Sequence, residues 1–236
     1  MQKDNITISP SIMSSDLLNL EKSIRDIEKE GIDTLHVDII DGAFSPSMPL
    51  GIDTVKQLRK ITDINFDVHL MTNNNEFFIQ EMIDIGVEQI SFHLETSVHV
   101  DRYINLIRNS GAKVGVALTP STPLSSLEYI LPRVDTVLLM LINPGFATDK
   151  NENQVSYAVQ KVNDLKKLIE KNDLDTRIEV DGRVSLETIP GLVGAGADIL
   201  VAGSTSLFIK GRSLAENKII MEEKINEGLS QREGVK

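Results

Sequence analysis

The sequence has no cysteine and no tryptophan, and only 4% of its 236 residues are aromatic. The lack of cysteine excludes disulfide bonds, thiolate metal sites and a cysteine nucleophile. Its 24 basic and 35 acidic residues give a net charge of −11, which argues against a nucleic-acid partner. The longest apolar runs, such as 137–142, are far shorter than the roughly 20 residues of a membrane span, and residues 1–5 contain no apolar signal core. We therefore expect a cytoplasmic protein with a small-molecule partner and no membrane partner.

Short runs rich in β-branched residues recur along the chain, and each is followed by a longer stretch with helical spacing of apolar residues. The predicted strands are 6–9, 34–39, 65–70, 89–93, 113–118, 136–142, 177–180 and 199–202. The predicted helices begin near residues 15, 54, 75, 99, 123, 153, 185 and 213. Eight units without a linker, and without Gly-x-Gly-x-x-Gly after the first strand, favour a single α/β (β/α)8 TIM barrel of parallel strands over a doubly wound sheet. We expect the barrel to span residues 1–225, followed by a frayed polar tail at 226–236.

Polar side chains gather at the predicted strand ends, which is where this fold carries its chemistry. His36 and Asp38 share one face of the second strand, and Asp67 and His69 share one face of the third, because side chains two apart point the same way. We expect His36, Asp38, His69 and Asp181 to converge on one divalent metal ion. Nitrogen and oxygen ligands without sulfur suit zinc, manganese, iron(II) or cobalt. The alternative is that each histidine only donates a hydrogen bond inside the barrel.

The remaining acidic and histidine candidates have less direct roles. Asp41 precedes Gly42 and is typical of a turn, whereas Asp67 lies deeper than His69 and is expected to support a ligand. His93 either lines the mouth of the barrel or is satisfied by a neighbour, and His99 is expected at a surface helix start.

Features of the later loops and of the methionines suggest how a substrate is held. Glycines in the loops after strands six to eight allow close backbone approach to a phosphate, and residues 204–208 are expected to form a short helix beside it. Methionine is polarisable and can pack against a flat intermediate, although gap-filling is its commoner role. The residues concerned are Gly145, Gly182, Gly203, Ser204, Met13, Met71 and Met140.

Between residues 8 and 208 the sequence resembles the ribulose-phosphate 3-epimerase family. The motifs that carry the resemblance, in order, are Ile8-Ser9-Pro10-Ser11-Ile12, His36-Val37-Asp38-Ile39-Ile40-Asp41-Gly42, Asp67-Val68-His69-Leu70-Met71, Phe92-His93, Asn143-Pro144-Gly145-Phe146, Glu179-Val180-Asp181-Gly182 and Ala202-Gly203-Ser204. The resemblance implies a ribulose-phosphate-binding barrel. It implies a metal-dependent isomerase that interconverts D-ribulose 5-phosphate and D-xylulose 5-phosphate in the pentose phosphate pathway, through an enediolate.

The resemblance also implies roles for individual residues. Asp38 and Asp181 would be metal ligands and also the proton donor and acceptor at C3, with His36 and His69 completing the ligands of one ion, zinc before iron, manganese or cobalt. A homo-oligomer is implied as well. The implied substrate contacts are Ser11, His69, Met71, Met140, Gly145, Phe146, Ala147, Gly182, Arg183, Gly203 and Ser204.

Departures from the family pattern concern the substrate more than the chemistry. Residues 147–150 read Ala-Thr-Asp-Lys where Gly-Gly-Gln is usual, and Arg183 stands where a small residue is common. We therefore predict that Arg183 anchors the phosphate, the alternative being an exposed arginine. The altered mouth leaves open another ketose phosphate, such as D-allulose 6-phosphate, and a catalytically retired sugar-phosphate-binding barrel. A decarboxylating barrel is discounted, because residues 38–41 contain no lysine.

Overall fold

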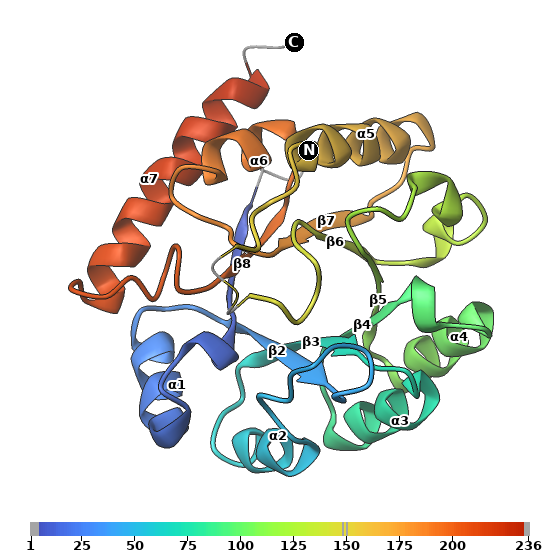
Figure 1. Cartoon of the computed structure of the whole chain (residues 1–236), viewed down its shortest axis with the longest axis horizontal. Helices are drawn as coiled ribbons and strands as arrows, with labels where there is room; N and C mark the ends of the chain where they lie inside the picture. Colours follow the sequence, from blue (N-terminus) through green and yellow to red (C-terminus); the bar gives the residue numbers. More distant parts are fainter. Residues whose placement is uncertain (1–4, 148, 150, 234–236) are drawn as a thin grey trace.

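The computed structural model describes residues 5–147, 149 and 151–233, and shows one parallel sheet curved into a barrel (Figure 1). The strands are β1 (Thr7–Pro10), β2 (Thr34–Ile40), β3 (Asn65–Met71), β4 (Gln89–His93), β5 (Lys113–Leu118), β6 (Thr136–Met140), β7 (Arg177–Asp181) and β8 (Ile199–Ala202). Neighbours along the chain pair in parallel from β2 to β8, and β1 pairs with β8. A parallel bridge between Ser11 and His36 then brings β1 against β2. The predicted TIM barrel is confirmed.

Helices surround the sheet, as Figure 1 shows. They are α1 (Leu20–Lys29), α2 (Ile52–Arg59), α3 (Asn75–Ile85), α4 (Val100–Ser110), α5 (Ala158–Lys171), α6 (Ile189–Ala195) and α7 (Leu214–Glu233). None of the helices in the described part of the chain is both long and apolar enough to cross a membrane. The first helical unit starts with a 3₁₀ turn, where Asp16 accepts the amide of Leu18, and ends at Gly31 with a φ of 71°. This start and stop match the predicted signals.

The helix predicted from residue 123 is wrong. Between β5 and β6 the chain forms two short 3₁₀ helices, Leu124–Leu127 and Leu131–Arg133. Pro132 interrupts the run, since proline has no amide hydrogen for the helical ladder and its ring clashes with the preceding turn. Leu127 and Leu131 are nevertheless buried. These leucines, whose spacing suggested a helix, therefore still cover the core.

The end of the described chain is more ordered than the expected tail. Helix α7 continues past residue 226 to Glu233, with Leu229 packed against the core. Arg232 donates to the main-chain carbonyls of Val193 and Ala197, which ties the last turn of α7 to α6. These contacts explain why the polar composition of this segment does not prevent it from being helical. Residues 234–236 lie outside the described residues.

Side chains alternate across the barrel wall, and this alternation positions the site. Val37 and Val68 face outward and are fully buried under the helices. Their neighbours His36, Asp38, Asp67 and His69 belong to the inward rows of β2 and β3. A small apolar cluster of Ala117, Leu138, Met140 and Ile142 fills the other side of the barrel interior. The polar residues are therefore concentrated on one part of the inner wall.

Candidate active site and metal centre

Four of the inward side chains meet at the carboxyl ends of β2, β3 and β7. Strand register places Asp38 of β2 beside His69 of β3, and Asp181 ends β7. Asp38 Oδ1 lies 3.4 Å from His36 Nε2 and 3.5 Å from His69 Nδ1. Asp181 Oδ2 lies 4.0 Å from His36 Nε2 and 3.6 Å from His69 Nδ1. The four ligand atoms lie within 4.8 Å of one another, so this group can hold a metal ion.

The two histidine nitrogens that face the carboxylates have no hydrogen-bond partner. His36 Nε2 and His69 Nδ1 are buried and unpartnered, while the other nitrogen of each ring is hydrogen-bonded: His36 Nδ1 to Asp67 Oδ2 at 2.9 Å and His69 Nε2 to His93 Nε2 at 3.0 Å. A buried nitrogen without a partner is destabilising unless something occupies the space in front of it. Two imidazole nitrogens and two carboxylate oxygens fit a divalent transition metal.

The four side chains also form a buried site that attracts positive charge. Burial by itself lowers the pKa of His36, but Asp38 and Asp67 raise that pKa well above its ordinary value of 6.5. Burial likewise lowers the pKa of His69, and Asp181 and Asp38 outweigh it, so the net shift is upward. Burial raises the pKa of Asp38, but His36 and His69 lower it well below its ordinary value of 3.8, so the carboxylate is ionised at neutral pH. Buried carboxylates in this arrangement require a cation, either imidazolium or a metal ion.

A second polar layer lies directly beneath this group. Asp67 accepts hydrogen bonds from Ser9 Oγ at 3.1 Å, from His36 Nδ1 at 2.9 Å and from Gln89 Nε2 at 2.7 Å. Gln89 also donates to Glu179 Oε2 at 3.1 Å. Burial, and then the charge of Asp67, raise the pKa of Glu179, which therefore holds a proton beside the ionised Asp67. Asp67 therefore holds the Nδ1 side of the His36 ring, and its role behind a metal ligand stays a prediction.

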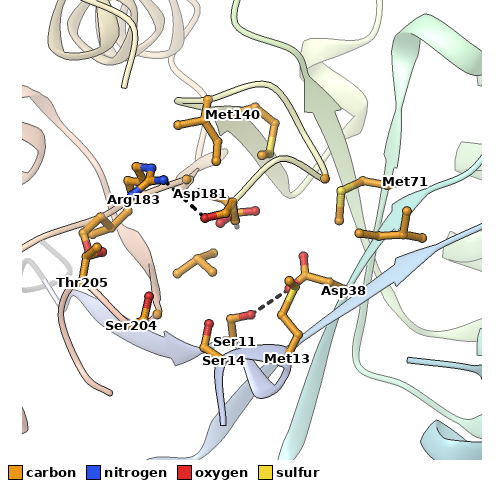
Figure 2. Close-up of a pocket in the computed structure, with 18 residues that line it drawn as sticks. Ser11, Met13, Ser14, Asp38, Met71, Met140, Asp181, Arg183, Ser204 and Thr205 are labelled. Atoms are coloured by element: carbon orange, nitrogen blue, oxygen red, sulfur yellow. Dashed lines mark hydrogen bonds between the residues drawn. The ribbon is translucent and has the colours of Figure 1, made fainter. Parts of the chain in front are cut away.

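The upper group opens into a pocket of about 80 Å³ (Figure 2). In Figure 2, Asp38 and Asp181 reach into this pocket from different sides, and Met71 and Met140 lie beside them. Ser11 Oγ donates to Asp38 Oδ2 at 2.8 Å. The predicted site residues that line the pocket are Ser11, Asp38, Met71, Met140, Gly145, Ala147, Asp181, Gly182, Arg183, Gly203 and Ser204.

Two predicted contact residues do not line the pocket. The Phe146 side chain is 39% exposed and lies outside the lining, and His69 is fully buried in the wall, where only its Nδ1 faces the carboxylates. Sequence reasoning, in turn, did not single out Thr205, which lines the pocket next to Ser204. The position of Thr205 in the loop after β8, directly following the predicted phosphate-binding residues, could have identified it as a pocket residue.

The part of the pocket wall that follows β8 differs from the expected short helix. Residues 204–208 form a turn in which the amides of Ser206, Leu207 and Phe208 all donate to the carbonyl of Gly203. Among the described residues, the amides of Ser204 and Thr205 donate to no protein acceptor. Those two amides therefore remain available to a ligand.

Arg183 lies on the same side of the pocket as Ser204 and Thr205 (Figure 2). It has a φ of 50°, a left-handed conformation that is unusual for a residue with a side chain. One terminal guanidinium nitrogen donates to the carbonyls of Ala147 and Asp149, while Nε is buried without a partner. Of the four residues 147–150 in which the loop departs from the family pattern, Thr148 and Lys150 lie outside the described residues.

The other predicted roles are resolved by hydrogen bonds. Asp41 Oδ1 accepts the amides of Ala43 and Phe44, which confirms the predicted turn. His93 is buried and satisfied by neighbours, since its Nδ1 lies 3.0 Å from Glu95 Oε2 and its Nε2 contacts His69. His99 is exposed at the start of α4, as expected.

A model of the Ribulose-phosphate 3 epimerase family matches residues 7–208 of the chain. The chain is 40% identical over 200 residues to the ribulose-phosphate 3-epimerase of Bacillus subtilis, covering 84% of the chain and 91% of that protein. It is 35% identical over 198 residues to the enzyme of the same name from Escherichia coli, covering 84% of the chain and 87% of that protein. Among solved structures, 3-hexulose-6-phosphate synthase from Salmonella typhimurium superposes with a TM-score of 0.66 at 15% identity, covering 94% of this chain and 100% of that one. The last likeness concerns the fold alone.

Proposed function

Because the chain belongs to the ribulose-phosphate 3-epimerase family, which is a family of isomerases, we propose that it interconverts D-ribulose 5-phosphate and D-xylulose 5-phosphate by proton transfer at C3. The observation that carries the proposal is the pair Asp38 and Asp181, two carboxylates that line one pocket from strands β2 and β7. These strands are separated by β1 and β8 on one side of the barrel and by β3 to β6 on the other. The two carboxylates therefore approach a bound sugar from different sides.

Inversion at a carbon needs one group that removes the proton and another that returns it on the opposite face. In the proposed mechanism, Asp38 and Asp181 share these tasks and exchange them with the direction of reaction. The lowered pKa of Asp38 keeps it ionised and able to accept a proton. The hydrogen bond from Ser11 Oγ holds its other oxygen, so Oδ1 stays turned toward the histidines and Asp181.

We propose that His36, Asp38, His69 and Asp181 hold one divalent ion, zinc in the first place and iron, manganese or cobalt as alternatives. The unpartnered nitrogens of His36 and His69 support this assignment. When bound, such an ion stabilises the negative charge that develops on the substrate oxygens next to C3. Met71 and Met140 supply apolar, polarisable walls, which exclude water from the reacting carbon.

We further propose that the phosphate binds between Arg183 and the free amides of Ser204 and Thr205, beside Gly145, Ala147, Gly182 and Gly203. Arg183 Nε is an unused buried donor, and the carbonyls of Ala147 and Asp149 hold the guanidinium at the pocket edge. Arg183→Gly would remove this donor and also relieve the left-handed backbone, so loss of fold is not expected. We expect a raised KM for the phosphorylated ketose, and an unchanged KM would contradict the assignment.

We propose that the protein is a homo-oligomer, as expected from the resemblance. Its large exposed apolar side chains include Val98 and Tyr129, which are 85% and 86% exposed and line one surface groove. Light scattering of the purified protein measures the state directly, and a monomer would contradict this proposal.

The reaction itself is tested by measuring C3 proton exchange and epimerisation with metal-replete protein. Ribulose 5-phosphate is compared with allulose 6-phosphate and a tetrulose phosphate, and we expect the highest kcat/KM for ribulose 5-phosphate. A preference for allulose 6-phosphate would replace the substrate but keep the chemistry. No exchange with any of the three would overturn the epimerase function.

A further inference from the structure

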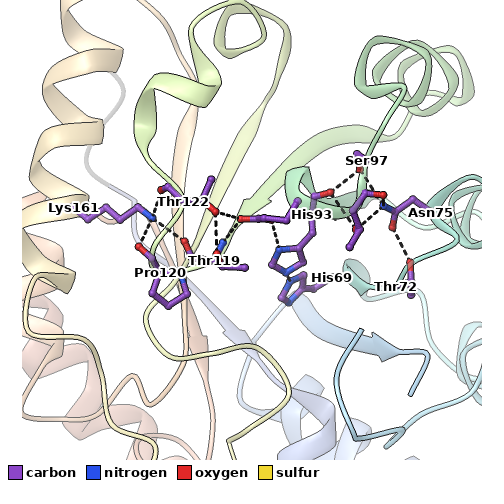
Figure 3. A network of polar contacts seen from close by, with 11 residues as sticks. His69, Thr72, Asn75, His93, Ser97, Thr119, Pro120, Thr122 and Lys161 are labelled. Atoms are coloured by element: carbon purple, nitrogen blue, oxygen red, sulfur yellow. Dashed lines mark hydrogen bonds and ion pairs between the residues drawn. The ribbon is translucent and has the colours of Figure 1, made fainter. Parts of the chain in front are cut away.

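Polar contacts run from His69 through His93, both labelled in Figure 3, to Glu95, and only the contact between the two histidines is fully buried. His69 Nε2 lies 3.0 Å from His93 Nε2, and His93 Nδ1 lies 3.0 Å from Glu95 Oε2. Both imidazole rings are fully buried. The ring of His93 is further held by Phe44, whose centroid is 4.7 Å away, and its main-chain carbonyl accepts a hydrogen bond from Ser97 Oγ at 2.6 Å.

The carboxylate of Glu95 determines which ring nitrogens of His93 and His69 carry hydrogen. An ionised carboxylate only accepts hydrogen bonds, so His93 Nδ1 must carry the hydrogen that points to Glu95. In a neutral imidazole the other nitrogen is then a bare acceptor, so His93 Nε2 accepts from His69 Nε2. When His69 is neutral, as a metal-binding imidazole must be, its remaining nitrogen, Nδ1, has its lone pair toward Asp38 and Asp181. This tautomer of His69 is the one that can bind a metal ion.

Glu95 is itself fixed by the loop after β5. Its Oε1 accepts the amide of Thr119 at 2.7 Å and also the hydroxyl of Thr122. Lys161 of α5 then donates to three carbonyls of the same loop, those of Thr119, Pro120 and Thr122, at 2.9, 2.9 and 2.8 Å. Figure 3 shows this ammonium group surrounded by the loop. The segment between β5 and β6 has no α-helix, and Lys161 of α5 holds its loop in one conformation.

We infer that Glu95 and His93 are positioning residues that set the tautomer and orientation of His69 as a metal ligand, and that Lys161 holds the loop that aligns Glu95. The inference rests on the metal site of the proposed function and adds to it residues that touch neither substrate nor metal. Carboxylate–histidine pairs behind a ligand orient it and increase its basicity.

The substitution Glu95→Gln tests the inference because Glu95 uses both oxygens as acceptors. Glutamine has one acceptor oxygen, so either Thr119 or His93 would face an amide NH2 group. We expect chelator competition with Zn²⁺ to show metal affinity about 10- to 100-fold weaker than in the wild type. Lys161→Met should weaken binding less, because it loosens the loop without removing the acceptor.

Glu88→Gln is the matched control. Glu88 Oε2 accepts the amide of Phe66 at 2.6 Å, a bond like that of Glu95 with Thr119, but at the opposite end of the barrel. We expect its Zn²⁺ affinity to equal that of the wild type. Equal affinities in Glu95→Gln and the wild type would overturn the inference and leave the metal site standing. A wild-type protein that binds no Zn²⁺, Mn²⁺, Fe²⁺ or Co²⁺ would overturn both.

A second measurement needs no variant and is independent of activity. Imidazole ¹⁵N chemical shifts of the Zn²⁺-loaded wild-type protein report which ring nitrogen carries hydrogen. We expect hydrogen on His93 Nδ1 and on His69 Nε2. Hydrogen on His93 Nε2 would overturn the inference even if Glu95→Gln failed to fold.

Discussion

Two polar layers are stacked inside this barrel, and only Asp181 of the upper layer is partly exposed, yet the layers have opposite characters. The upper layer, His36 Nε2 with Asp38, His69 and Asp181, leaves two nitrogens unpartnered and opens into the pocket. In the lower layer, built on Asp67, Glu179 and Gln89, the Asp67 carboxylate accepts three hydrogen bonds.

His36 belongs to both layers, with one nitrogen in each. The acidic residues of the lower layer, with His36, also lie close enough to be a candidate ligand group. However, His36 Nδ1 is already occupied by Asp67, and Glu179 holds a proton. Proximity of histidine and carboxylate groups therefore does not by itself make a metal site. Glu179 Oε1 in the lower layer also lacks a hydrogen-bond partner, so it is the unpartnered histidine nitrogens and the access to a pocket that distinguish the upper layer.

The largest expected effect comes from the upper layer. Asp181→Asn keeps the size of the side chain but removes a carboxylate that can move a proton. We expect kcat to fall by about 10²- to 10⁴-fold, since this is the range for general acid–base groups. The midpoint of urea unfolding should change little, and an active Asp181→Asn enzyme would contradict the role of the upper layer.

Removal of Asp67 should instead act on stability. Asp67→Ala leaves the buried donors of Ser9, His36 and Gln89 without their acceptor, and breaking a buried pair from one side typically costs about 3–5 kcal/mol. The free energy of unfolding in urea measures this loss. If Asp67→Ala were as stable as the wild type, the lower layer would not be the structural support described above.

The protonated state of Glu179 predicts how stability depends on pH. Its pKa is raised by burial and by Asp67 above the ordinary 4.5, so above pH 4.5 the folded protein keeps a proton that the unfolded chain loses. Through this group, stability falls as pH rises, by up to about 1.4 kcal/mol per unit, until the folded protein also releases the proton.

Glu179→Gln removes this titration and mimics the neutral acid. Urea unfolding of both proteins at about pH 5, 6, 7 and 8, with a chelator present, measures the difference. We expect the wild type to lose stability relative to the variant as pH rises. Parallel curves would show that Glu179 is ionised in the folded protein.

The smallest effect is expected for Ser9→Ala. It removes one donor to Asp67, at 3.1 Å, and leaves the bonds from His36 and Gln89 in place. We expect a loss of about 0.5–1.5 kcal/mol in the free energy of unfolding and no change in kcat. A large drop in kcat would mean that the two layers are coupled more tightly than their separate bonding indicates.

Most of the fold could be predicted from local patterns. The strands at 89–93, 113–118 and 199–202 have the predicted bounds, because buried parallel strands are short runs of apolar and β-branched residues between turn signals. The segment between β5 and β6 does not follow its local pattern. Its apolar spacing is helical, but proline and the contacts of Lys161 select another backbone.

The residues of the site could be predicted from the sequence, but the contacts between them could not. The spacing of His36 and Asp38 puts both on one face of a strand, whatever the rest of the chain does. Nothing in the spacing indicates that His93 and Glu95 stand behind His69, because that contact joins neighbouring strands whose register depends on the closed barrel.

The eight units of the barrel and the polar residues at the strand ends are encoded locally, because both follow from periodicity along the chain. Which atoms lack a hydrogen-bond partner depends instead on how distant segments pack. Contacts between distant strands and loops create the hydrogen bonds of Asp67. They also leave His36, His69 and Arg183 each with one buried nitrogen that has no partner. A hydrogen bond is short-ranged and directional, so its two partners are fixed only when the barrel closes and brings them together.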